Sequence, residues 1–150
     1  MAVPNSFALA AVQMGHDLVI AHPEGYELDE ELIETSRQIA VAAGGSLEIT
    51  NDIDAAFSGA EVVYAKSWGT KQFYGNTDQD VTTRAQYRGK WIVDEEKMSR
   101  TENAIFMHCL PVRRNVIVTD GVIDSAASVV IDEAENRLHV QKAIMAARIK

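Results

Sequence analysis

Residues 17–50, DLVIAHPEGYELDEELIETSRQIAVAAGGSLEIT, predict a strand, a helix and a second strand in direct succession. Residues 17–22 and 46–50 are short apolar runs of the length typical of buried strands. Between them, apolar residues recur at helical spacing after Asp29, and the glycine pair at 44–45 ends the periodic segment. A strand–helix–strand unit of this kind predicts two parallel strands joined by a crossover helix.

The same alternation continues along the rest of the chain. Apolar runs at residues 61–66 and 104–108 predict two further strands, and residues 128–131 predict a last short strand. Residues 67–90 are rich in glycine and polar residues and predict a long loop with one short helix. We therefore expect one α/β domain over residues 1–150, with a three-layer, doubly wound and mainly parallel sheet.

The predicted order of elements opens with a helix, between Asn5 and Gly15, and not with a strand. The first strand of a doubly wound unit normally lies in the middle of its sheet. Its absence predicts a gap in the sheet, with backbone groups that need another partner. Either another segment fills this gap or the chain is a fragment.

Composition limits the classes of function. The chain of 150 residues has a formal net charge of −8 and no basic run, which argues against binding nucleic acids or anionic membranes. Its one cysteine, Cys109, excludes an internal disulfide framework and suits a reducing, cytoplasmic setting. No apolar run approaches the roughly 20 residues that span a bilayer. These properties predict a cytoplasmic protein.

Ligands of parallel sheets bind beyond the carboxyl ends of the strands, which directs attention to residues 106–115, FMHCLPVRRN. Backbone carbonyls in the turn after His108 could accept hydrogen bonds from an NH₂ group, and Arg113 and Arg114 could bind a carboxylate or phosphate. A solvated loop with two surface arginines explains the pattern equally well. Neighbours along a strand face opposite sides, so His108 and Cys109 do not form a base–nucleophile pair, and no catalytic residue is assigned.

Two further cations lie in suggestive places. Lys66 ends a predicted strand in YAKSWG, where it could bind a ligand or simply add solubility. Arg137 lies one helical turn after Glu133, and an ion pair between them at i,i+4 is a better explanation than an anion site. A dinucleotide-binding domain is unsupported, because no G-x-G-x-x-G follows a strand.

Three segments together resemble the carboxyl-terminal half of ornithine-type carbamoyltransferases. They are HCLP at residues 108–111, TDGVID at residues 119–124 and DEAENRLHVQKAIM at residues 132–145. VVYAKSWG at residues 62–69 and VRRN at residues 112–115 are similar to the N-acetylornithine or N-succinylornithine branch of that family. Plain ornithine enzymes usually carry S-M-G in place of the S-W-G found here. The resemblance covers essentially the whole chain.

The resemblance implies transfer of a carbamoyl group from carbamoyl phosphate to the δ-amine of an N-acylated ornithine, a step of arginine biosynthesis, without a metal or organic cofactor. Matched residue by residue, Cys109 and Leu110 would hold the carbamoyl group through their backbone, and Arg137 would contact carbamoyl phosphate. Lys66 would bind the acylornithine with Leu110 beside it, and Arg113 would bind a carboxylate of that substrate.

The departures from the family pattern are informative as well. The phosphate-binding half, with its S-x-R-T loop and later H-P-x-Q, is absent, and so is the strand expected before Ala2. The family forms homotrimers, and its acylornithine branch has a trefoil knot to which the missing stretch contributes. Ile117 stands where the acetylornithine branch has a lysine, which leaves a succinyl or other acyl group open. We expect no turnover by the chain alone; a plain ornithine enzyme or a non-catalytic binding or regulatory domain are the alternatives.

Overall fold

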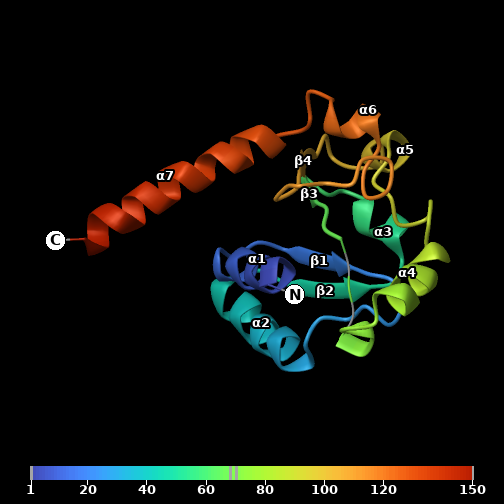
Figure 1. Cartoon of the computed structure of the whole chain (residues 1–150). Helices are drawn as coiled ribbons and strands as arrows, with labels where there is room; N and C mark the ends of the chain where they lie inside the picture. The colour runs from blue at the N-terminus through green and yellow to red at the C-terminus, as the bar shows by residue number, and fades with distance from the viewer. Residues whose placement is uncertain (1, 68, 70, 150) are drawn as a thin grey trace. The chain divides into compact units, whose positions relative to one another are not determined.

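The computed structural model describes residues 2–67, 69 and 71–149 of the chain (Figure 1). The chain divides into two compact units, the first made of residues 1–56 and 67–91 and the second of residues 57–66 and 92–150. Each unit contains one two-stranded parallel sheet. The α/β class and the parallel pairing predicted from the sequence are therefore confirmed.

The first unit is built on the predicted strand–helix–strand segment. Strands β1 (Leu18–Ala21) and β2 (Leu47–Thr50) pair in parallel, with Leu18 opposite Leu47, and α2 (Glu30–Ala43) connects them. α1 (Ala2–Gln13) packs against α2. Gly44 ends α2 in the left-handed region at φ 83°, a conformation that glycine adopts without steric cost. The glycine pair thus ends the helix as expected.

The remainder of the first unit lies between residues 67 and 91. It contains a 3₁₀ turn η1 (Lys71–Phe73) and α4 (Thr77–Ala85), whose first turn is capped by Asn76. The predicted loop with one short helix is confirmed. The buried apolar side chains of this unit are Ala8, Val12, Tyr26, Ile33 and Ala40.

The second unit holds β3 (Val62–Tyr64) and β4 (Ile105–Met107), which pair in parallel with Val63 opposite Phe106. α3 (Ile53–Phe57) crosses from the first unit into the second. The other helices are α5 (Glu95–Met98), α6 (Asp120–Ile123) and α7 (Val130–Arg148). The core of this unit contains Phe57, Ala65, Val93, Ala104, Phe106, Ile117, Val118, Val122, Ile123 and Val130.

Helix α7 runs away from β3, β4, α5 and α6 of its own unit (Figure 1). Val130 at its start is buried, whereas its residues from Ala134 onward are exposed. The strand predicted for residues 128–131 is wrong. Ser128 forms a single bridge with Phe106, after which Glu133 N donates to Val129 O and the chain turns into the helix.

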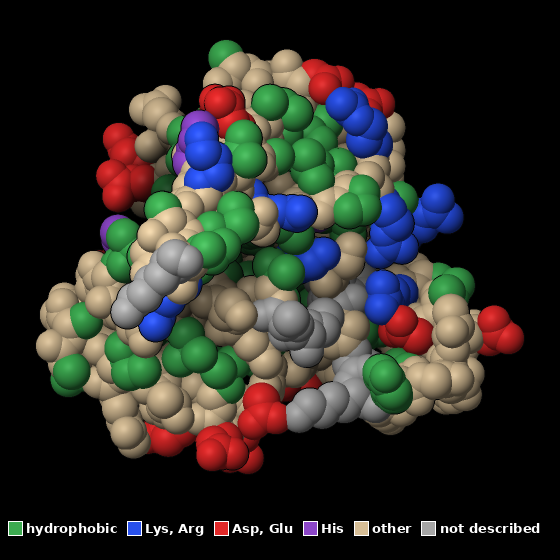
Figure 2. Space-filling model, turned by 60° about the vertical axis from the view of Figure 1, so that its left-hand side comes forward, with side chains coloured by type: hydrophobic (Ala, Val, Ile, Leu, Met, Phe, Trp, Pro, Cys, Tyr) green, Lys and Arg blue, Asp and Glu red, His purple; other side chains and the backbone are tan. Residues whose placement is uncertain are grey.

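The described strands form two separate pairs and not one continuous sheet. Within the described residues no helix combines the length and apolar character needed to cross a bilayer. Exposed apolar side chains nevertheless interrupt the charged surface (Figure 2).

Candidate functional site

The turn after β4 is held by hydrogen bonds from two of its backbone N–H groups to side chains. The N–H of His108 donates to Glu133 Oε2 at 3.0 Å, and the N–H of Leu110 donates to His108 Nδ1 at 2.9 Å. Because Nδ1 accepts, the neutral imidazole carries its proton on Nε2. His108 is 1% exposed, so this arrangement lies in the protein interior.

Glu133 connects this turn to the neighbouring strand. Its other carboxylate oxygen, Oε1, accepts a hydrogen bond from Tyr64 Oη at 2.9 Å. Burial, followed by the nearby carboxylate of Glu133, raises the pKa of Tyr64 and keeps its hydroxyl protonated as a donor. One side chain in the first turn of α7 therefore joins the ends of β3 and β4.

The ion pair predicted between Glu133 and Arg137 is wrong. Within the described part of the chain, the carboxylate of Glu133 is engaged by Tyr64 and His108, and no ion pair reaches Arg137. The reason is a tertiary contact over 69 residues, which i,i+4 spacing does not reveal. Arg137 is an exposed cation one turn further along α7.

The carbonyl oxygens of Cys109 and Leu110 accept no hydrogen bond from any residue that the structure describes. The N–H of Leu110 is engaged by His108, and Leu110 lies in the left-handed region at φ 44°. Carbonyls left unpaired at the end of a strand are acceptors for a ligand that brings N–H donors. This pair of acceptors is the most distinctive chemical feature of the second unit.

Lys66 lies at the same ends of β3 and β4. The N–H of Ala65 donates to Met107 O at 3.0 Å, which extends the pairing of these strands by one residue and places Lys66 directly after it. Burial, and then the positive charge of Lys66, lower the pKa of His108. The structure thus groups Lys66 with the His108–Leu110 turn, as the sequence predicted.

The two adjacent arginines differ in their surroundings. Arg114 donates to Asp120 at 2.7 Å and also to Asp124, and Asn115 donates to Asp120 at 2.8 Å. Hydrogen bonds from Arg114 hold the pKa of both aspartates below the usual range. The guanidinium of Arg113 is exposed and has no acidic partner among the described residues. Arg113 is therefore the arginine available to a ligand.

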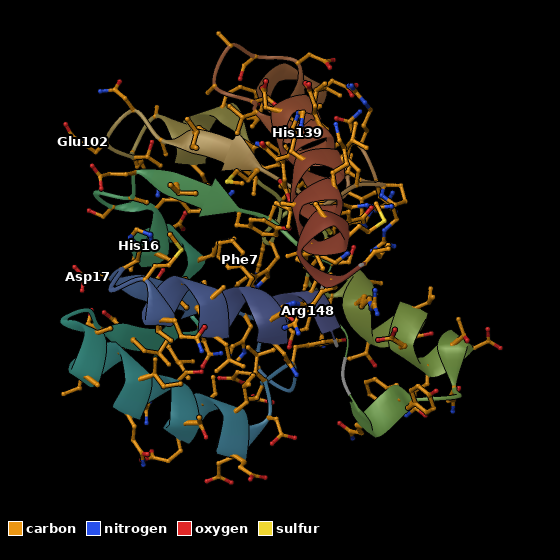
Figure 3. The ribbon with its side chains drawn as sticks, turned by 90° about the vertical axis from the view of Figure 1, so that its left-hand side faces the viewer. Phe7, His16, Asp17, Glu102, His139 and Arg148 are labelled. Atoms are coloured by element: carbon orange, nitrogen blue, oxygen red, sulfur yellow. The ribbon has the colours of Figure 1, made fainter. Side chains whose placement is uncertain are left out.

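Lys66, Cys109 and Leu110 lie together at the strand ends, whereas among the described residues no hydrogen bond or ion pair links Arg113 or Arg137 to them. His139 and Arg148, labelled in Figure 3, mark the course of α7 beyond Arg137, and His139 lies 3.5 Å from Glu135 on the same helix. Trp68, part of the S-W-G motif, falls outside the described residues.

The sequence did not point to Glu133 and Tyr64 as residues of this region. Local spacing pairs Glu133 with Arg137, and Tyr64 lies within the predicted strand at residues 61–66. The one signal that could have found Glu133 is its place in the first turn of a helix that follows a buried strand. That position brings a carboxylate near strand ends in many α/β folds, but it does not identify the donors.

Comparison with known proteins identifies the family of the chain. Residues 2–148 match the family model for the Asp/Orn-binding domain of aspartate/ornithine carbamoyltransferases. The chain belongs to this family. It is 52% identical over 149 residues to the N-acetylornithine carbamoyltransferase of Xanthomonas campestris, covering 99% of this chain and 44% of that protein. The resemblance to the acylornithine branch is therefore confirmed.

Two further comparisons extend the family assignment. The N-succinylornithine carbamoyltransferase of Bacteroides thetaiotaomicron is 43% identical over 136 residues, covering 91% of this chain and 38% of that protein. A crystal structure of acetylornithine transcarbamylase complexed with acetylcitrulline matches with a TM-score of 0.92 and 51% identity, over 98% of this chain and 44% of that one. The chain spans less than half the length of these relatives.

Proposed function

We propose that this chain supplies the amino-acid-binding part of an N-acylornithine carbamoyltransferase. The observation that carries the proposal is the pair of carbonyls at Cys109 and Leu110, beside Lys66, which accept no hydrogen bond from the described residues of this family member. Carbonyl oxygens accept hydrogen bonds from the NH₂ of a carbamoyl group, and the lysine attracts an anionic substrate. The arginine-biosynthetic role follows from the same assignment.

In the proposed reaction the δ-amine nitrogen of the acylornithine attacks the carbonyl carbon of carbamoyl phosphate. A C–N bond forms, the C–O bond to phosphate breaks, and phosphate leaves with that electron pair while the amine loses a proton. The carbonyls of Cys109 and Leu110 hold the carbamoyl NH₂, and Arg137 contacts the phosphate. Rate acceleration comes from positioning and from stabilising charge on the leaving group.

The acylornithine is assigned to the remaining residues. Lys66 and Arg113 provide positive charge for its carboxylate, and Leu110 contacts its chain. Ile117 is 4% exposed, and its carbonyl accepts a hydrogen bond from Val93 N at 2.9 Å, so its apolar side chain is part of the core. It offers no cation to the acyl group, and the proposal covers acetyl and succinyl substrates alike.

The proposal also covers the parts of the complete enzyme that this chain does not include. The phosphate-binding half comes from sequence corresponding to the other part of the relatives, and the complete enzyme is a cytoplasmic homotrimer with a trefoil knot. No metal or organic cofactor is required by the proposed chemistry.

A chimera tests the proposal directly. This chain would replace the matching segment of the Xanthomonas campestris enzyme, and carbamoyl transfer would be assayed with acetylornithine, succinylornithine and ornithine. We expect transfer to an acylated ornithine in the chimera and none by the chain alone. Arg137→Gln in the chimera would raise the KM for carbamoyl phosphate.

Three outcomes would contradict the proposal. Preference of a folded chimera for free ornithine would indicate the plain ornithine branch. Turnover by the unaided chain would refute the need for a second half. Micromolar binding of an acylornithine by the unaided chain in calorimetry, combined with an inactive but folded chimera, would indicate a stand-alone binding domain.

A further inference from the structure

We propose that Glu133 is a positioning residue that fixes the Cys109–Leu110 turn through Tyr64 and His108. This inference rests on the proposed function, since it concerns the carbonyls assigned there to the carbamoyl group. Glu133 itself is not assigned a contact with either substrate.

The two oxygens of the Glu133 carboxylate accept hydrogen bonds from two different residues. Oε1 accepts from Tyr64 Oη at 2.9 Å and Oε2 accepts from His108 N at 3.0 Å. The two donors belong to the ends of neighbouring strands, and the acceptor belongs to α7. A single carboxylate therefore fixes three elements relative to one another at the point where β4 ends.

His108 in turn holds the backbone of Leu110. The same residue whose N–H is held by Glu133 accepts the Leu110 N–H on Nδ1 at 2.9 Å. Leu110 has φ 44°, which is unfavourable for a residue with a branched side chain and persists when neighbouring contacts impose it. The hydrogen bond on the Leu110 N–H is one such contact.

The side chain of His108 is buried. His108 is 1% exposed, and Nε2 has no hydrogen-bond partner among the described residues. The imidazole is therefore held by packing and by its Nδ1 contact, and its backbone by Glu133. If the carboxylate is removed, the His108 N–H loses its acceptor and the Tyr64 hydroxyl loses its hydrogen bond to Glu133. We expect the turn to relax, because these groups would then seek other partners.

A simpler role for Glu133 is a negative charge in the first turn of α7, which would favour the helix dipole. Asp132 occupies the same first turn and is exposed. Asp132→Ala is therefore the matched control, because it removes an equivalent charge and leaves the carboxylate bridge intact. Glu133→Gln retains one acceptor oxygen and is the conservative variant.

The first measurement uses the chain itself and does not depend on catalysis. Amide hydrogen exchange of His108 and Leu110 and the imidazole ¹⁵N shifts of His108 would be followed by NMR in Glu133→Ala, Glu133→Gln, Asp132→Ala and Tyr64→Phe. In Glu133→Ala we expect exchange at both amides to accelerate by about tenfold, the factor expected for a lost hydrogen bond. Glu133→Gln would restore part of the protection, and Asp132→Ala would match the unmodified chain.

The second measurement uses the chimera with an acylornithine. Glu133→Ala would lower kcat by about tenfold or more, because carbonyls displaced by fractions of an ångström no longer orient the carbamoyl group. Glu133→Gln would recover part of kcat, and Asp132→Ala would leave both kcat and KM unchanged. If Glu133→Ala fails to fold, Glu133→Gln and Tyr64→Phe still report, through slower turnover and faster exchange at the same two amides.

The outcomes separate the two proposals. The positioning role would be overturned if, in an active chimera, Glu133→Ala equals Asp132→Ala in amide exchange and kcat. Where Glu133→Ala does not fold, the same result for Glu133→Gln and Tyr64→Phe would overturn it. A folded chimera without activity in any form would refute the proposed function. In that case faster exchange at His108 and Leu110 would still support the structural part of the inference.

Discussion

Two short segments of the second unit, the His108–Leu110 turn and the loop at residues 113–118, are both fixed by carboxylates but in opposite environments. In the turn, Glu133 acts on a residue that is 1% exposed. In the loop, Asp120 and Asp124 bind the guanidinium of Arg114 at the surface. The loop has more charged contacts than the turn. Loss of a contact in the turn is expected to cost more stability.

The two segments differ in whether water can replace a contact that is lost. Exposed ion pairs are screened by salt, and water takes over when they break. A buried N–H that loses its acceptor has no substitute. Counting contacts would therefore rank the Arg114 cluster first, whereas burial ranks the turn first.

The largest effect is expected for His108→Ala. Removal of a buried imidazole leaves a cavity and an unsatisfied Leu110 N–H, and we expect the free energy of unfolding to fall by about 2–5 kcal/mol. Chemical denaturation would measure it. His108→Asn, whose amide oxygen can replace Nδ1 as acceptor, would lose less. Equal losses in both variants would show that the Nδ1 hydrogen bond contributes nothing.

The next largest effect is expected for acylornithine binding, where Arg113 and Arg114 should differ. Arg113→Gln in the chimera would weaken acylornithine binding by about 10–100-fold, the range of one charge-assisted hydrogen bond. Arg114→Gln would change it little, because its guanidinium is already engaged by two aspartates. Calorimetric titration of the two variants would measure this. A larger loss for Arg114→Gln would reverse the assignment.

Mild acid is expected to destabilise the turn. Burial and Lys66 lower the pKa of His108 below its ordinary value of about 6.5. The unfolded chain therefore takes up the proton first, and stability falls as the pH drops from about 6.5 through the folded-state pKa. Thermal midpoints measured between pH 7 and 5 would show the decline. The decline would be smaller in His108→Asn, and an unchanged decline would assign it to other groups.

The smallest effect is expected at the surface cluster. Because the folded-state pKa values of Asp120 and Asp124 are lowered, their contribution is present above the unfolded value of about 3.9 and is lost as the pH falls through the folded values. Arg114→Gln would remove this dependence and most of the salt sensitivity of the loop. Hydrogen exchange of the Asn115 amide at low and high salt would detect it. Salt-independent exchange in the unmodified chain would contradict the surface account.

Most of the elements could be predicted because their signals are local. Apolar runs located β1, β2, β3 and β4, and Gly44 located the end of α2, since chain direction and backbone conformation are encoded nearby. The strand predicted for residues 128–131 was wrong for the same reason. An apolar run of four residues fits a strand or a helix start, and the choice depended on where Phe106 lies.

The candidate site was predictable in position but not in its internal bonding. Strand order placed Lys66 and Cys109 at one edge, because parallel strands end together. The partner of Glu133 was mistaken, since local spacing favoured Arg137 and the real donors are 25 and 69 residues away. The same limit hid the difference between Arg113 and Arg114, which depends on two aspartates beyond the loop.

Helix α7 is packed at its first turn and exposed from Ala134 onward. A helix of 19 residues held at one end gains little from packing along its length, and isolated helices of that size are marginal in water. Its order should therefore decay from Glu133 toward Arg148, with opening becoming easier at each successive turn. Arg137 lies only one turn from the fixed end, where this fraying is least, so its position should be better defined than that of Arg148 at the far end.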